Sequence, residues 1–317
     1  MPEIPDVTVY VEAIAARVVG QPLTRMRLGS PFVLRTFAPP AKSFEGKKAT
    51  LVRRMGKRIV IGFEGDLFVV IHLMVAGRFR WTDPGAKLPG KLGLAAFDWP
   101  SGTLMLTEAG TKKRASIHLL EGEAGVLALH AGGVELETCD DASFLALLQR
   151  ENHTLKRALT DPHILSGIGN AYSDEILWEA QLSPVKLTSR LTAAEASTLL
   201  SASRRTLARF TALLRTQAHD KTGGFPEKVT AFRPEMAVHG KFGQPCPRCA
   251  EPVQRIAYAD NETNYCATCQ TAGKLLADRA LSRLLRKDWP KSLEEMEEMK
   301  AARRGRTARK TSATRCI

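Results

Sequence analysis

The chain begins Met1-Pro2-Glu3-Ile4-Pro5-Asp6, and the residues after this stretch continue it into a helical pattern. Apolar side chains recur at helical spacing over residues 6–18, and Asp6 or Thr8 is placed to cap the first turn. The pattern predicts a helix that holds the N-terminus against a core.

A reactive amine can form at this end of the chain. Removal of Met1 is the ordinary outcome when the second residue is small, and it leaves the nitrogen of Pro2 as a free secondary amine. An α-amino group has a pKa of about 8, so part of it is neutral at pH 7 and can attack a carbonyl-like carbon. Glu3, beside it, is a candidate general acid or base. The alternative is a frayed end without a chemical role.

The overall charge points to a polyanionic partner. The chain has 317 residues, 44% of them apolar, and a formal net charge of +13. This length allows two or more domains, and the positive excess favours nucleic acid over a membrane surface. No apolar run approaches the roughly 18 residues of a membrane span, and no signal-peptide pattern is present, so we expect a cytoplasmic protein without a membrane partner.

Short β-type runs broken by Gly and Pro fill the region from about residue 23 to residue 120. Glu64-Gly65-Asp66 has the composition of a hairpin turn between two of them. Several short strands at this spacing favour a β-sandwich or barrel. The predicted strands are residues 50–52, 59–63, 67–72, 78–81, 92–98 and 103–107.

The second half of the chain is predicted to be mainly helical. Residues 218–242 read as a long loop, and a capping box at Ser292 and Glu295 predicts the start of a late helix. The tail from Lys300 carries seven basic residues and no acidic one, which favours disorder and at most non-specific phosphate contacts. The other predicted helices are residues 142–149, 155–159, 172–180, 193–217 and 274–286.

The strongest local signal is Cys246-Pro247-Arg248-Cys249 followed, after sixteen residues, by Cys266-Ala267-Thr268-Cys269. Two such knuckles supply four thiolates to one tetrahedral zinc ion. Without histidine and without an open position, the site should be structural. The two other cysteines, Cys139 and Cys316, suit a reducing compartment.

A glycine turn precedes one of the predicted helices in the stretch from Leu165 to Leu177. Gly167 and Gly169 permit a close turn, and Asn170 can cap the helix that follows. Such a turn offers backbone N–H groups to a phosphate, although a plain connector between helices has the same composition. Basic residues at Lys57 and Lys156 invite two interpretations as well, contact with a DNA backbone or a solvated surface.

Together these stretches resemble the Fpg/Nei family of DNA glycosylases, which have a helix–two-turn–helix (H2TH) module and a C-terminal zinc finger. The matching motifs occur in the family's order and cover roughly residues 2–273. They are Pro2 to Val7, Arg54 to Lys57, Ile71 to Gly77, Ile168 to Glu175, and Val238 to Cys246.

The resemblance implies an α+β multidomain fold and a DNA-bending enzyme that flips a damaged nucleotide into a pocket between domains. We expect an N-terminal β-sandwich with a flanking helix in residues 1–131 and a helical H2TH domain in residues 132–237. A zinc-ribbon β-hairpin is expected in residues 238–273, and an extension without a family counterpart in residues 274–317. The expected cofactor is one structural Zn²⁺, and the expected partner is damaged double-stranded DNA bound by a monomer. The resemblance implies a cytoplasmic protein of bacterial type that is associated with the nucleoid.

The resemblance also implies roles for single residues. Pro2 would attack C1′ of the damaged nucleotide, Glu3 would handle protons at the sugar, and Lys57 would donate a proton during β-elimination. Glu175 would support the H2TH helix. DNA contacts are expected from Lys156, Gly169, Asn170, Arg54, Lys112, Lys113 and Arg114.

Several positions depart from the family pattern. Asp6 replaces a Glu, and the intercalating Met of the purine-specific branch aligns with Val75, one position after Met74. The loop at residues 108–115 lacks the usual aromatic wedge. The zinc-finger arginine falls on Asn261, which cannot make a charge-assisted bidentate contact with phosphate.

The sequence therefore predicts a bifunctional DNA glycosylase and AP lyase in which β-elimination persists and δ-elimination is weakened. A second hypothesis is a damage-binding or abasic-site-binding paralogue with little base release, which the altered wedge loop favours. An RNA-binding zinc-ribbon protein is a third, which leaves the N-terminus unexplained. The base that is removed, an oxidised purine or an oxidised pyrimidine, is not predicted.

Overall fold

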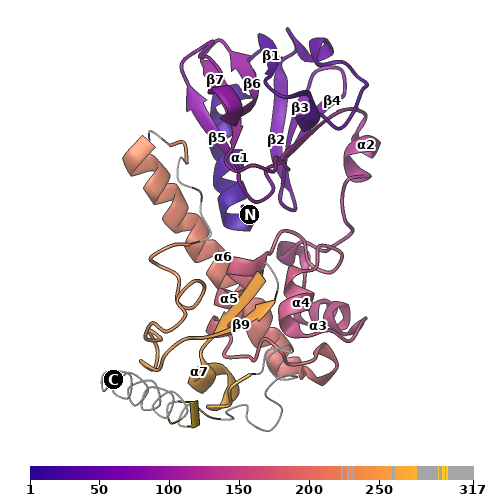
Figure 1. Cartoon of the computed structure of the whole chain (residues 1–317). Coiled ribbons are helices and arrows are strands. Elements are labelled where there is room, and N and C mark those ends of the chain that lie inside the picture. Colours follow the sequence, from indigo (N-terminus) through magenta and orange to yellow (C-terminus); the bar gives the residue numbers. More distant parts are fainter. Residues whose placement is uncertain are drawn as a thin grey trace, which may run out of the picture.

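The computed structural model describes residues 1–222, 224–226, 229, 232–258, 261–276, 292, 295, 296 and 298. Two bodies lie one above the other, strands in one and helices with a zinc-finger hairpin in the other (Figure 1). The N-terminus lies between them. Residues far apart in the sequence therefore meet at this junction.

The first helix, α1 (Ile4–Val18), begins two residues earlier than predicted, and neither Asp6 nor Thr8 is its N-cap. Glu3 holds that position, and its backbone N–H donates to Asp6 Oδ2 at 3.0 Å. Pro5 fits the first turn because that turn needs no N–H donor from it. The helix buries one apolar face, including Tyr10 and Ile14.

Two four-stranded antiparallel sheets form the N-terminal body, as the predicted sandwich requires. The first has the order β1-β6-β7-β5 and the second the order β2-β3-β4-β8. Their bounds are β1 Arg25–Leu28, β2 Ala49–Met55, β3 Arg58–Phe63, β4 Leu67–His72, β5 Gly77–Thr82, β6 Gly93–Trp99, β7 Gly102–Glu108 and β8 Ser116–Glu121. All six predicted strands are confirmed, and β1 and β8 were missed.

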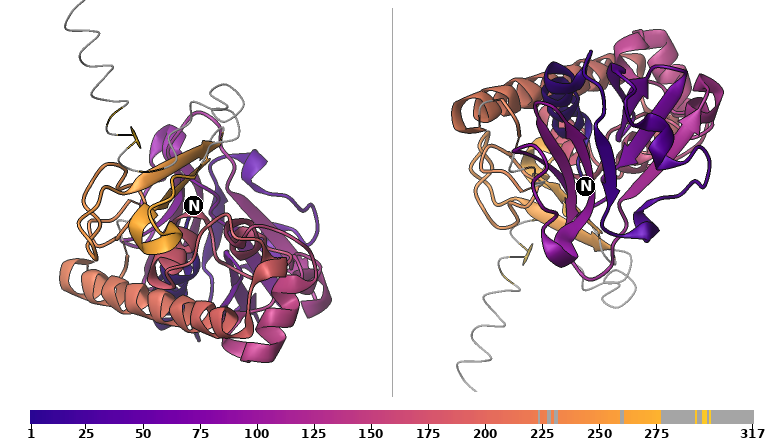
Figure 2. Two further views of the ribbon diagram at one scale, coloured as in Figure 1. Left: turned by 90° about the horizontal axis from the view of Figure 1, so that it is seen from below. Right: turned by 90° about the horizontal axis from the view of Figure 1, so that it is seen from above.

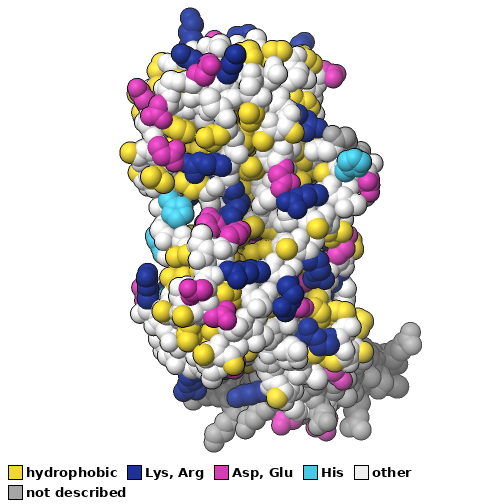
Figure 3. Space-filling model, turned by 180° about the vertical axis from the view of Figure 1, so that it is seen from behind, with side chains coloured by type: hydrophobic (Ala, Val, Ile, Leu, Met, Phe, Trp, Pro, Cys, Tyr) yellow, Lys and Arg dark blue, Asp and Glu magenta, His cyan; other side chains and the backbone are white. Residues whose placement is uncertain are grey.

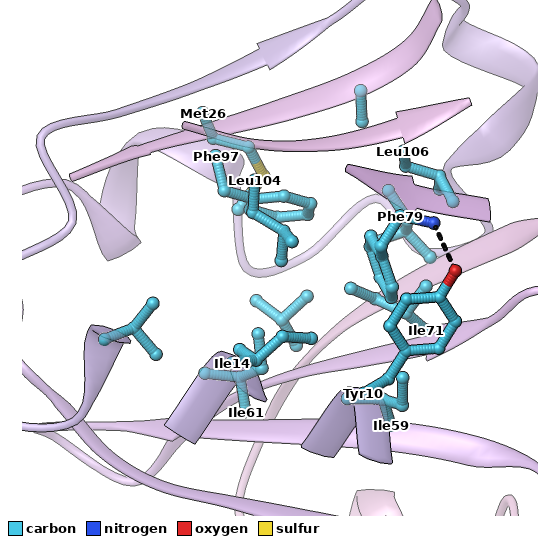
Figure 4. Packing of buried hydrophobic residues seen from close by; sticks show 14 of the residues in the cluster. Tyr10, Ile14, Met26, Ile59, Ile61, Ile71, Phe79, Phe97, Leu104 and Leu106 are labelled. Carbon is cyan, nitrogen blue, oxygen red and sulfur yellow. Dashed lines mark hydrogen bonds between the residues drawn. The ribbon is translucent and has the colours of Figure 1, made fainter. Parts of the chain in front are cut away.

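The core of this body lies between the two sheets and α1 (Figure 4). Tyr10 reaches across from α1, where its hydroxyl accepts a hydrogen bond from Phe79 N at 3.3 Å and its ring meets the Phe79 ring edge-on. Phe225 and Val229, which follow the long helix of the other body, also pack in this core. The two bodies are thus joined by apolar contacts.

The helical body has a second core, built mainly around α5 (Asn170–Glu179) and α6 (Ala193–Thr222). The 30-residue α6 runs along one side of the molecule, and the zinc-finger hairpin lies on the opposite side (Figure 2). It extends to Thr222, so the loop predicted for residues 218–242 starts later than expected. The remaining helices are α2 Glu123–Leu127, α3 Asp141–Gln149 and α4 Leu155–Thr160, with 3₁₀ turns at Pro31–Val33, Ala41–Phe44, Gly90–Leu92, Leu136–Thr138 and Thr188–Arg190.

The C-terminal hairpin consists of β9 (Gln254–Tyr258) and β10 (Asn261–Tyr265), followed by α7 (Ala267–Thr271). Residues 274–276, the first three of the helix predicted for 274–286, are not helical, and Lys274 pairs with Ser292 in an isolated bridge. The rest of that predicted helix and the tail from Lys300 lie outside the described residues. At the predicted capping box, Glu295 N donates to Ser292 Oγ at 3.2 Å. Within the described ranges, no helix is both long enough and apolar enough to span a membrane.

Candidate active site

The first residues of the chain are bonded to the turn that precedes α5. Ile4 N donates to Gly167 O at 3.2 Å. The Glu3 carboxylate accepts three backbone N–H groups, from Gly169 at 2.6 Å, Ala171 at 2.9 Å and Tyr172 at 3.2 Å. A carboxylate at a helix N-terminus satisfies free N–H groups and complements the helix dipole. Glu3 therefore caps a helix that begins 167 positions later.

This contact corrects the predicted role of Asn170 as the helix cap. Asn170 is the first helical residue, and the glycine before it, Gly169, holds the N-cap position. Glycine has no side chain to serve as a cap, so the cap comes from the other body of the protein. The N–H of Gly169, which could bind phosphate, donates to Glu3 in this structure.

Both glycines of the turn are required by the close approach. Gly167 has φ +86°, and a Cβ there would lie 2.5 Å from Ile4 Cγ1. A Cβ on Gly169 would lie 2.6 Å from Glu3 Cδ. Because real Cβ contacts are not this short, any larger residue would push the N-terminus away from α5.

Three ionisable groups meet at this junction and perturb one another. Burial lowers the pKa of the Met1 amino group, which is the N-terminus in this structure, and Glu3 opposes that shift. Burial raises the pKa of Glu3, while Lys57 and the N–H groups at the α5 N-terminus lower it. Burial also lowers the pKa of Lys57, with Glu3 acting in the other direction. Pro2 is buried next to Glu3, and Lys57 acts electrostatically on both Glu3 and the Met1 amino group, while the catalytic roles of these residues stay predictions.

Asp6 forms a buried ion pair that is not apparent from the sequence. Its Oδ1 accepts from Arg233 Nη2 at 2.9 Å, and the two side chains are only 3% and 4% exposed. Burial raises the pKa of Asp6, and Arg233 is the largest influence that lowers it. A single arginine in a loop carries no spacing pattern, so no sequence signal identifies this partner.

Lys156 and Asn170, both predicted to hold phosphate, lie next to each other. Lys156 Nζ donates to Asn170 O and to Asp174 Oδ1, each at 2.6 Å. Asp174 is fully buried, and its other oxygen lies 2.8 Å from His239 Nδ1 and accepts from Asn264 N at 3.1 Å. One carboxylate on α5 therefore links the predicted phosphate site to the zinc-finger hairpin.

The neighbouring carboxylate on α5 makes a second link to the same region. Glu175 accepts the backbone N–H groups of Ala237, Val238 and His239 at 2.8–2.9 Å. These three residues lead into the zinc finger. Glu175 therefore fixes the entry of the finger onto α5.

The four predicted cysteines form one cluster with their sulfur atoms within 4.8 Å of one another. The distance from Cys246 Sγ to Cys269 Sγ is 4.0 Å, and that from Cys249 Sγ to Cys266 Sγ is 3.4 Å. Tetrahedral zinc with Zn–S bonds of about 2.3 Å requires sulfur atoms about 3.8 Å apart, so the cluster fits the ion. These four thiolates hold one structural Zn²⁺.

Removal of the zinc is expected to be visible at Trp178. The indole N–H of Trp178 donates to Cys246 Sγ at 3.3 Å, and α5 meets the finger there. A chelator that strips the metal should change the Trp178 emission and lower Tm by about 4 °C or more, because the finger loses its cross-link. Metal release and tryptophan fluorescence measure both effects.

A Trp178→Phe variant is the control. Its emission should respond less to zinc release, because Trp81 and Trp99 lie in the other core. Unchanged emission and Tm after complete zinc release would contradict a structural site.

Sequence comparisons agree with this arrangement. Residues 1–114 match the formamidopyrimidine-DNA glycosylase N-terminal domain, residues 133–219 its H2TH domain, and residues 243–272 a zinc finger found in FPG and IleRS. The formamidopyrimidine-DNA glycosylase of Thermus thermophilus is 31% identical over 283 residues, which cover 86% of this chain and all of that protein. The chain belongs to the formamidopyrimidine-DNA glycosylase family.

Another member of the formamidopyrimidine-DNA glycosylase family, from Variovorax paradoxus, is 28% identical over 85% of this chain and all of its own length. Among solved structures, a complex of Lactococcus lactis Fpg with DNA containing N7-benzyl-Fapy-dG has a TM-score of 0.75 at 25% identity. It covers 85% of this chain and all of the Lactococcus chain. The similarity thus extends across the sandwich, the helical body and the finger.

The basic residues predicted to contact DNA differ from one another in what surrounds their side chains. Arg54 pairs with Glu135 at 2.7 Å, so its charge is used at the junction between the bodies. In the loop between β7 and β8, Lys113 Nζ donates to Glu108 O, while Lys112 and Arg114 are exposed. The structure therefore leaves Lys112 and Arg114 accessible to a ligand and holds Arg54 in an ion pair.

Two of the positions that depart from the glycosylase family pattern, Val75 and Asn261, lie at exposed sites, whereas Asp6 is buried. Val75 is 57% exposed in the turn between β4 and β5, and the preceding Met74 has a positive φ of 52°. Asn261 is exposed at the start of β10. The exposed aliphatic side chain at Val75 is shorter than a methionine, so it reaches less far from the turn.

Proposed function

We propose that this protein is a bifunctional DNA glycosylase and AP lyase that acts through the amine of Pro2. The observation that supports the proposal most strongly is that Pro2 is buried next to Glu3, whose carboxylate is fixed at the N-terminus of α5. The Met1 amino group that precedes Pro2 has a pKa lowered by burial, and the Pro2 amine exposed by removal of Met1 is expected to share this environment. A neutral amine is the nucleophilic form, and Schiff-base chemistry needs that form near neutral pH. A protein that only binds DNA has no need of this arrangement.

In the proposed reaction, the Pro2 nitrogen bonds to C1′ of the damaged nucleotide while the bond from C1′ to the base breaks. The departing base takes up a proton, and the sugar ring opens to leave an iminium ion on Pro2. Loss of a proton from C2′ then breaks the C3′–O bond, which is β-elimination. Glu3 handles protons at the sugar, and Lys57 donates a proton during elimination.

The proposed ligand is damaged double-stranded DNA, bound by a monomer across the junction between the two bodies. Solved structures of Lactococcus lactis Fpg are complexes with abasic-site DNA and with DNA that contains N7-benzyl-Fapy-dG. Lys and Arg side chains lie on both bodies of this chain on the face shown in Figure 3. In this chain, Lys156 and Asn170 would hold phosphates near the lesion, and Lys112 and Arg114 would contact DNA from the N-terminal body. Phosphate contacts of this kind position the duplex without reading its sequence.

Borohydride trapping tests the proposal, because it reduces the iminium ion to a stable covalent bond. Duplexes with an abasic site, 8-oxoguanine or thymine glycol are incubated with the full chain and borohydride. An adduct is expected on the abasic site, and the base lesion that traps best identifies the substrate class. Absence of adduct on all three duplexes, with binding retained, would favour a damage-binding protein instead.

Strand cleavage is expected to stop mainly at the β-elimination product. Asn261 is uncharged, whereas δ-elimination in the family is assigned to an arginine at this position. On an abasic-site duplex, Asn261→Arg should raise the ratio of δ to β product roughly tenfold. Asn261→Gln, which adds length without charge, is the control and should leave the ratio unchanged. A wild-type chain that gives mainly the δ product would contradict this expectation.

A further inference from the structure

The ion pair between Asp6 and Arg233 is connected to the reacting end of the chain by a short series of hydrogen bonds. Arg233 Nη2 donates to Asp6 Oδ1 at 2.9 Å, and the other oxygen of Asp6 accepts from Glu3 N at 3.0 Å. The Glu3 peptide is the first peptide after the proposed nucleophile, Pro2. Asp6 therefore holds the peptide that directly follows the proposed nucleophile.

Other contacts hold the same short segment from its opposite side. The Glu3 carboxylate is bonded to the N-terminus of α5, and Ile4 N donates to Gly167 O. The Asp6 carboxylate is the acceptor for the Glu3 N–H itself. Without it, the side chain of Glu3 stays in place while the backbone that carries the amine is free to rotate.

Arg233 is itself held by the helical body. It lies four residues before Ala237, the first of three residues whose N–H groups bind Glu175, and Met236 N donates to Arg233 O at 3.2 Å. The side chain is buried, and its Nε has no hydrogen-bond partner in the described part of the chain. The Asp6 carboxylate is therefore the acceptor to which this buried charge is directed.

The charges around Asp6 and Arg233 explain why both partners of the ion pair are needed. Asp6 faces Arg233 and the N-terminal amino group, and the amino group also faces Glu3, Arg78 and Lys57. Loss of one partner leaves a buried charge uncompensated, which is strongly unfavourable. A buried pair of this kind costs free energy to form, so a role in positioning accounts for it better than a gain in stability does.

We propose that Arg233 is a positioning residue for the reaction at the N-terminus, because it fixes the Asp6 carboxylate that holds the Glu3 N–H. This inference rests on the proposed function and adds a residue to it. Arg233 has no direct role in bond making or breaking. It sets the geometry of the Pro2 amine from the opposite body of the protein, so formation of the Schiff base depends on the contact between the two bodies.

The test measures the rate of borohydride trapping on an abasic-site duplex with saturating enzyme, and separately the affinity for a duplex with a tetrahydrofuran site, which forms no Schiff base. Arg233→Gln should lower the trapping rate roughly tenfold, with Kd unchanged within about twofold. Arg233→Lys, which keeps the charge, should recover most of the rate. Thermal unfolding of each variant shows that the measured chains are folded.

A double substitution makes the test specific to the pair. Asp6→Asn keeps an oxygen that can accept from the Glu3 N–H and removes the charge. Because both substitutions act on the same ion pair, the double variant Asp6→Asn with Arg233→Gln should trap no more slowly than either single variant. Arg215→Gln is the matched control, because Arg215 pairs with Glu12 of α1 at an exposed position, through bonds of 2.6 and 2.8 Å. Its trapping rate should equal that of the wild type.

A wild-type trapping rate for Arg233→Gln would overturn the inference and leave the proposed function intact. The inference would also be overturned if the rate losses of the two single variants multiplied in the double variant. It would likewise be overturned if each loss of trapping rate were matched by an equal loss of affinity. If the wild-type chain forms no adduct, the proposed function fails and the inference fails with it.

Discussion

A chain with one serine inserted between Met1 and Pro2 is expected to lose borohydride trapping by roughly 10²-fold or more. The insertion turns the Pro2 nitrogen into an amide and moves the free amine one residue away from Glu3 and Lys57. A displacement of about 1 Å at a reacting centre costs up to about 10²-fold in rate, and one residue spans about 3.8 Å. The rate of adduct formation on an abasic-site duplex measures the effect.

The control for this experiment is Pro2→Gly, which keeps a free amine at position 2 and should trap more slowly than wild type but measurably. The sign of the pH dependence follows from burial at this end of the chain, which lowers the pKa of the Met1 amino group and is expected to lower that of the Pro2 amine as well. The amine becomes neutral as pH rises, so the wild-type rate should rise with pH and level off below the ordinary pKa of about 8. Equal trapping by the inserted chain and the wild type would show that a different residue is the nucleophile.

The second large effect is expected for Glu3→Gln, which should slow base release by roughly 10²- to 10⁴-fold. The chain provides a matched comparison in Glu175. Both carboxylates are buried, both accept three backbone N–H groups, and burial raises the pKa of both. The Gln variant of each turns an acceptor into a donor that faces an N–H group.

Because the local environments match, both Gln variants should lose similar stability, about 1–3 kcal/mol in urea unfolding. Only Glu3→Gln should lose activity, since Glu175 faces the finger entry and not the amine. Single-turnover release of the damaged base separates the two variants. If both lose activity in proportion to stability, Glu3 acts only as a helix cap.

The architecture could be predicted from the sequence because its signals are local or strongly patterned. The cysteine knuckles, the Glu64–Asp66 turn and the apolar periodicities each depend on a few neighbouring residues. The strand β1 has only four residues, and β8 alternates Ser116 and His118 with apolar positions, so neither forms a long apolar run. These two strands are recognised only through their pairing partners.

The contacts that create the site could not be predicted in the same way. Glu3 meets Gly169 across 166 residues, and Asp6 meets Arg233 across 227 residues. Helix α1 starts at Ile4, with Glu3 at its N-cap position, and the carboxylate of the same Glu3 also caps α5. Such pairings depend on how two separately folded bodies meet, and no spacing within one segment encodes that.

The proline amine, placed by the junction of the two bodies, is proposed to form the covalent bond to DNA. Trapping the wild-type chain on an abasic-site duplex with borohydride, followed by digestion of the adduct and mass spectrometry of the modified peptide, tests this directly. A sugar remnant is expected on the N-terminal peptide, at the Pro2 nitrogen. A remnant on Lys57 or another lysine would contradict it.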